Sequence, residues 1–162
     1  MDFEGDDLRP EYKRSDFGEL VRGKYAERLK ERITELHESA MAFAEQSVLE
    51  KDPARAGHLL RSAFEKECSA ADLLAGSFEE EPTRSILHRS AATLAAECRE
   101  YAEAERLVDQ GLAGNPPADI GEELTDVRQR VRRALAAEER HARMPRAIGA
   151  LRKVRKTGPH DT

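Results

Sequence analysis

Apolar residues in the first half of the chain recur at the spacing that one face of an α-helix requires. The intervals are four, three, four, three and four positions, through Leu29, Ile33, Leu36, Ala40, Phe43 and Ser47. Side chains at this spacing lie above one another on a helix, so they form one continuous stripe. The stripe predicts a helix from about Tyr25 to Glu50.

Four further helices are predicted by apolar stripes of the same kind. The second helix follows Asp52 and Pro53, since proline fits the first position of a helix but not its interior. Pro82 opens the third helix, and the Gly-Asn-Pro-Pro sequence at residues 114–117 stops the fourth. The fifth carries an apolar stripe over residues 120–135. Helices joined by short links lie antiparallel to their neighbours, so we expect an all-α array of about five helices.

The two ends of the chain lack such stripes. Residues 1–24 contain scattered charges, three glycines and one proline, which predicts an extended, mobile segment. Residues 25–139 form the predicted helical domain, and residues 140–162 a basic tail. The tail carries a net charge of +6 and the rest of the chain −11, a combination that is not typical of a general nucleic-acid-binding protein. For the tail itself, a solubilising role and an electrostatic contact with RNA, DNA or an acidic partner are both open.

The composition favours a helical, cytoplasmic protein. Charged residues make up 36% of the 162 residues and aromatic residues only 5%, with no Trp, which is more typical of helices than of a β-sandwich. There is no apolar run of about 20 residues and the first residues are acidic, so neither a membrane span nor a secretion signal is expected. Cys68 and Cys98 lie in helical stripes, and we expect small buried side chains rather than a disulfide.

Small and aromatic residues follow a definite order between residues 85 and 117. The positions that carry this order are Ala92, Ala95, Tyr101, Ala104, Val108, Gly111 and Pro116. The segment resembles one tetratricopeptide repeat, a helix pair of about 34 residues, with His88 and Arg99 in place of its usual large residue and turn glycine. A weaker copy precedes it, so the resemblance spans about residues 36–139. It implies stacked helical hairpins whose crossings need small side chains.

A tetratricopeptide-like array also implies a concave surface formed by the first helix of each hairpin. Six residues are predicted to face it: Glu38, Met41, Glu45, Arg89, Thr93 and Glu97. Mixed apolar and charged side chains suit a peptide or a helix as ligand. The alternative is that these are ordinary surface positions, or that a neighbouring helix covers them.

The N-terminal segment contains Arg-Pro-Glu-Tyr at residues 9–12 and Val-Arg-Gly-Lys-Tyr-Ala at residues 21–26. These motifs resemble those of short bacterial proteins, many of which look like antitoxins encoded beside small toxins. The resemblance implies a protein partner, and rings beside basic side chains are typical of interface hot spots. The predicted partner-binding residues are Tyr12, Phe17, Val21, Arg22, Gly23, Lys24 and Tyr25. The alternative is that the rings fold back on the helical domain.

Motifs for catalysis and metal binding are missing from the sequence. It contains no phosphate-binding loop, dinucleotide glycine pattern, nucleophile elbow or Cys-x-x-Cys pair, and its five histidines lack the spacing of zinc ligands. We therefore expect no enzyme activity, no cofactor and no metal. The sequence favours a protein-interaction module that binds through its N-terminal segment, with the helical body as scaffold or homodimer. The alternatives are an adaptor with a peptide in its concave groove, and a nucleic-acid contact through the basic tail.

Overall fold

The computed structural model describes the backbone of residues 20–154 and the side chains of residues 23–143. This part of the chain contains five α-helices, one short 3-10 helix and no β-strand. The elements are α1 (Leu20–Leu49), α2 (Pro53–Leu73), η1 (Phe78–Glu80), α3 (Thr83–Glu97), α4 (Tyr101–Leu112) and α5 (Ala118–Val154). The prediction of an all-α protein with about five helices is confirmed.

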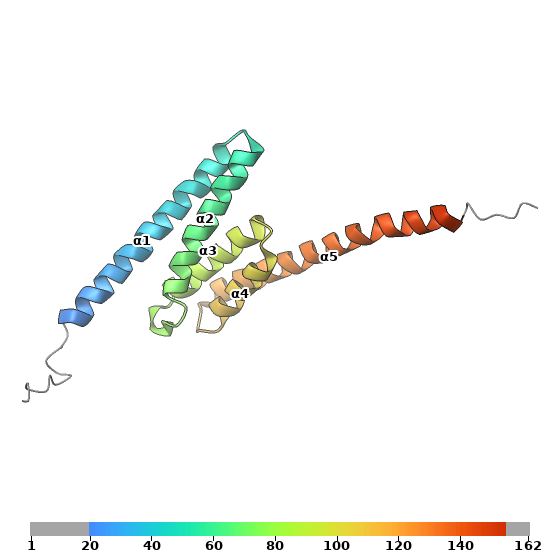
Figure 1. The fold of residues 1–162 in the computed structure, drawn as a ribbon. Helices are drawn as coiled ribbons and strands as arrows, with labels where there is room; N and C mark the ends of the chain where they lie inside the picture. The colour runs from blue at the N-terminus through green and yellow to red at the C-terminus, as the bar shows by residue number, and fades with distance from the viewer. Residues whose placement is uncertain (1–19, 155–162) are drawn as a thin grey trace, which may run out of the picture.

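Each helix packs against the next one along the chain (Figure 1). α3 also packs against α5, whereas α1 packs against α2 and against no other helix in the described part. The long α1–α2 hairpin is therefore attached to the rest of the array through α2. α5 runs past α4 and extends away from the other helices in Figure 1.

Small side chains form the crossings between the helices. Eight alanines are fully buried in the described part: Ala40, Ala63, Ala70, Ala71, Ala91, Ala92, Ala95 and Ala104. Small residues allow helices to approach closely, and larger side chains such as Leu107 and Leu124 fill the space beside them. Up to residue 143, the last buried side chain of α5 is Val131, and Leu135 is already 36% exposed. Within the described side chains, the core thus covers only the first part of this helix.

Two helix ends differ from the sequence prediction. The sequence predicts an extended segment up to residue 24, but α1 begins at Leu20. It also predicts a separate tail from residue 140, but α5 continues to Val154. Residues 20–24 include Leu, Arg and Lys, and residues 140–154 include Ala, Leu, Arg and Lys, which prolong a helix that packing has already nucleated. Gly23 does not stop α1, and a Cβ there would meet nothing within 4 Å.

Two helix termini have the local structure that their residues predict. Asp52 caps α2, since its side chain accepts a hydrogen bond from the amide of Ala54 at 3.0 Å, and Pro53 takes the first helical position. At the end of α3, Arg99 has φ = 63°. Its amide donates to the carbonyl of Ala96 at 3.1 Å, and the amide of Glu100 donates to that of Ala95 at 2.9 Å. This bonding defines a Schellman motif, whose left-handed position glycine usually occupies.

Candidate functional site

The predicted partner-binding residues of the N-terminal segment fall into three groups. Tyr12 and Phe17 lie outside the described residues. Val21 and Arg22 belong to α1, but their side chains are not among those described. Gly23, Lys24 and Tyr25 lie exposed in the first turns of α1, and the Tyr25 side chain is 71% exposed.

Tyr25 borders an apolar groove of about 490 Å³, which we call the Tyr25 groove. One side is formed by Tyr25, Ala26, Leu29 and Ile33 of α1. The other is formed by the turn that follows α2 and by the first residue of α3, through Leu74, Ser77, Glu79, Glu80 and Thr83. Because apolar side chains line the groove and two carboxylates border it, it fits an apolar side chain of a partner that also carries positive charge.

Arg84 holds the turn that forms the second side of the Tyr25 groove. Its Nε donates to Oε1 of Glu81 at 2.9 Å, and its guanidinium carbon lies 4.9 Å from the centre of the Phe78 ring. Burial by itself raises the pKa of the Glu81 carboxyl, but hydrogen bonds from Ser85 and Arg84 outweigh it, so this pKa lies below its ordinary value. Glu81 is therefore ionised at neutral pH, which keeps the turn attached to α3.

A buried carboxylate joins the two helices of the first hairpin. Glu67 of α2 is fully buried, and Nδ1 of His37 on α1 lies 3.1 Å and 2.9 Å from its two oxygens. A buried charge needs such a partner, because burial without one is costly. The contact fixes the position of α1 on α2, and with it the α1 side of the Tyr25 groove.

The six residues predicted for the concave surface do not come together. Arg89 and Thr93 line a second groove of about 590 Å³ between α3 and α5, which we call the Arg89 groove. Glu97 is exposed near the end of α3 and does not line it. Glu38, Met41 and Glu45 lie on α1, which has no contact with α3. The predicted surface is therefore divided between separate helices.

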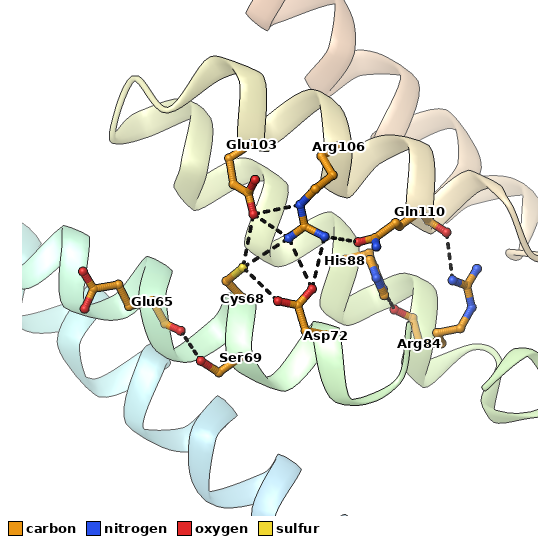
Figure 2. A network of polar contacts seen from close by, with 9 residues as sticks. All are labelled: Glu65, Cys68, Ser69, Asp72, Arg84, His88, Glu103, Arg106 and Gln110. Carbon is orange, nitrogen blue, oxygen red and sulfur yellow. Dashed lines mark hydrogen bonds and ion pairs between the residues drawn. The ribbon is translucent and has the colours of Figure 1, made fainter. Parts of the chain in front are cut away.

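A polar network joins α2 to α4 around Arg106 (Figure 2). The Arg106 guanidinium donates to Oε1 of Glu103 at 2.9 Å, to Oε1 of Gln110 at 2.6 Å and to Oδ1 of Asp72 at 3.2 Å. The bond from Arg106 holds the pKa of the Glu103 carboxyl below its ordinary value. Cys68 lies at the centre of this network, with its Sγ 3.6 Å from Nη2 of Arg106.

The Cys68 thiol is not poised for nucleophilic chemistry. Burial and the nearby carboxylates of Asp72 and Glu103 raise its pKa to about 12, so the thiol stays protonated at neutral pH. Cys68 and Cys98 are both free and half-buried, whereas the sequence predicts full burial. Their polar neighbours on the helix surface explain the difference for Cys68. The network is best understood as a structural contact between two helices.

The described residues contain neither a metal site nor a membrane-spanning helix. Within residues 23–143, no three His, Cys, Asp or Glu side chains are placed so that they could hold a metal ion. None of the described helices is long and apolar enough to cross a membrane. Comparison of the chain with protein-family models, curated proteins and solved structures finds no match.

Proposed function

We propose that this chain is a non-enzymatic protein-interaction module whose partner docks on the N-terminal end of α1 and in the Tyr25 groove. The observation that supports this best is the 71% exposure of Tyr25 beside an apolar groove. An aromatic ring buries about 150–250 Å² when it is covered, so burial of this ring stabilises a complex strongly. Lys30 lines the groove and Lys24 lies near it, so a basic partner places its positive side chains at Glu79 and Glu80 on the other side.

The resemblance of residues 9–26 to antitoxin segments points to the kind of partner. On this proposal the partner is a small, basic toxin-like protein in the bacterial cytoplasm, and the helical body serves as its scaffold. Glu79 and Glu80 border the groove and form no ion pair within the described residues, so they are available to basic side chains. The net charge of −11 outside the tail attracts a basic protein in the same way.

Capture of a partner by matched variants tests the proposal. The tagged full-length chain, the Arg22→Ala and Tyr25→Ala double variant and a Val48→Ala control are compared by affinity purification and mass spectrometry. Val48 lies at the opposite end of α1 and is 84% exposed, so its replacement removes an equally accessible apolar side chain. We expect the double variant to lose a protein that the wild type and the control both retain. The proposal fails if the double variant retains this protein.

An adaptor with a peptide in a groove between its helices is the second candidate. The Arg89 groove supports it, because it contains two of the residues predicted for such a surface. Loss of capture after Arg89→Ala, with capture intact in the Tyr25 double variant, favours this alternative. The experiment therefore separates the two surfaces.

A further inference from the structure

The Arg89 groove has charged sides. Arg89 and Thr93 of α3 form one side, and Asp126, Arg130 and Arg133 of α5 contribute to the other. Val127 lies between them but is only 1% exposed. A ligand that fills the groove therefore meets mainly polar and charged side chains.

The arginines of α5 differ in whether a carboxylate neutralises them. Arg128 pairs with Asp109, and Nε of Arg132 lies 3.7 Å from Oε1 of Glu105, so both are paired with α4. Arg130 and Arg133 line the groove instead, and neither forms an ion pair within the described residues. Arg133 donates only to the side-chain amide of Gln129, at 3.2 Å. Uncompensated positive charge on this part of α5 is thus concentrated at the groove.

Arg89 contributes a third guanidinium from α3. Its Nη1 donates to Oε2 of Glu123 at 2.7 Å, while its Nε is buried without any hydrogen-bond partner. A buried donor without an acceptor is unfavourable, so an acceptor supplied by a ligand or by water stabilises this arrangement. The Glu123 carboxylate neutralises one of the three arginines, and Asp126 adds a second negative charge. A surplus of positive charge remains.

We propose that the Arg89 groove binds an acidic peptide segment of a protein partner, with carboxylates on Arg130 and Arg133. Charge complementarity carries this assignment, since three arginines face two carboxylates in the groove, on a chain whose first 139 residues have a net charge of −11. The inference rests on the second candidate function, the adaptor with a peptide in this groove, and concerns a surface other than the Tyr25 groove.

Fluorescence anisotropy with the full-length chain tests this proposal. The probe is a short labelled peptide of glutamate and leucine, and a lysine and leucine peptide and a short DNA duplex serve as comparisons. The Arg130→Glu and Arg133→Glu double variant is matched by an Arg140→Glu and Arg143→Glu control. The control makes the same change in charge on the same helix, at exposed positions beyond the groove.

We expect the acidic peptide to bind in a salt-dependent way and the groove variant to weaken binding about tenfold or more, which is about 1.4 kcal/mol. The control should weaken it by a much smaller factor. The lysine peptide suits the Tyr25 groove instead, so the groove variant should not weaken its binding. Equal weakening by both variants would show that the basic tail attracts the peptide without the groove, and would overturn the proposal. Absence of binding at low salt, or tighter groove-dependent binding of the DNA duplex, would also overturn it.

Discussion

Nη1 of Arg84 on α3 donates a hydrogen bond of 2.8 Å to the backbone carbonyl of Gln110, near the end of α4. Nη2 of the same side chain donates to the carbonyl of Gly111 at 3.0 Å. The Gly111 carbonyl is among those that the end of a helix leaves without an intrahelical donor, and the Gln110 carbonyl accepts a longer bond of 3.3 Å from the amide of Ala113. A fully buried arginine of one helix thus completes the hydrogen bonding of the next, while it also holds the turn beside the Tyr25 groove.

Arg84→Ala should destabilise the protein strongly, because it removes the donor to Oε1 of Glu81 and the side-chain donors to the Gln110 and Gly111 carbonyls. We expect the free energy of unfolding in urea to fall by about 3 kcal/mol or more, as for other broken buried ion pairs. Arg84→Lys keeps the charge but cannot form the same set of hydrogen bonds. Its free energy of unfolding should therefore lie between those of the wild type and Arg84→Ala. A loss below about 1 kcal/mol for Arg84→Ala would contradict the role given to this side chain.

Gly114 should be intolerant of a side chain because of Arg84. A Cβ at this position would overlap Nη2 of Arg84 and lie 2.6 Å from Oε1 of Glu81. Gly114→Ala is expected to cost about 1–3 kcal/mol of stability, and much less when Arg84 is already alanine. Additive effects of the two substitutions would rule out this explanation.

Gly121→Ala provides a matched control for Gly114→Ala. A Cβ at Gly121 would meet only Cγ of Pro116, at 3.9 Å. Gly121 also lies inside α5, where alanine is favoured over glycine by up to about 1 kcal/mol. This substitution should therefore raise the midpoint of urea unfolding.

Arg99→Gly should stabilise the chain. Arg99 has φ = 63°, which favours glycine, and the exposed ion pair between Arg99 and Glu138 contributes little by comparison. Arg99→Ala loses the same ion pair but keeps Cβ, so the difference between the two variants isolates the backbone effect. We expect the glycine variant to be more stable than the alanine variant by about 1 kcal/mol in thermal and urea unfolding. Equal stability would mean that this turn relaxes without strain.

His88 should make stability depend on pH below its ordinary pKa of 6.5. Burial lowers its pKa below the ordinary 6.5, a backbone bond to the Arg84 carbonyl opposes this, and the Arg84 charge lowers it further. The unfolded chain therefore binds a proton at a higher pH than the folded chain does. Its contribution to stability is complete above pH 6.5 and is lost as the pH falls through 6.5 towards the folded pKa.

Urea unfolding between pH 5 and 7 measures this effect when the wild type is compared with His88→Gln and an exposed control, His58→Gln. The free energy of unfolding of the wild type and the control should fall as the pH falls. It should fall more steeply with pH than that of the His88 variant. Identical slopes for all three proteins would exclude His88 as the titrating group.

Much of the fold follows from local patterns in the sequence. The predicted stripe of α1 places Ile33, Leu36 and Ala40 in the core, because the spacing of apolar residues alone determines which face of a helix is buried. The start of α2 at Asp52 and Pro53 is predictable for a similar reason, since a cap and an N-terminal proline act locally. The outer ends of α1 and α5 are less predictable, because helix propensity continues there without an apolar stripe.

Features that depend on contacts between helices could not be predicted from the sequence. Arg84 is a charged residue of a type that is rarely buried, so no pattern marks it as the side chain that joins α3 to α4. The two sides of the Tyr25 groove come from segments far apart in the chain, of which only Tyr25 itself was predicted. Likewise, the spacing of Glu38 and Arg89 on their own helices does not reveal that α1 stays apart from α3.

The central claim is that the partner covers Tyr25, and the affinity of the captured protein for matched variants tests it most directly. Isothermal titration of that protein into the full-length wild type, Tyr25→Ala and Val48→Ala gives three dissociation constants. We predict that Tyr25→Ala weakens binding by about 30-fold, which corresponds to a hot spot of about 2 kcal/mol, while Val48→Ala leaves the constant unchanged. Equal affinity of the wild type and Tyr25→Ala, with unchanged helix content in both, would contradict the claim.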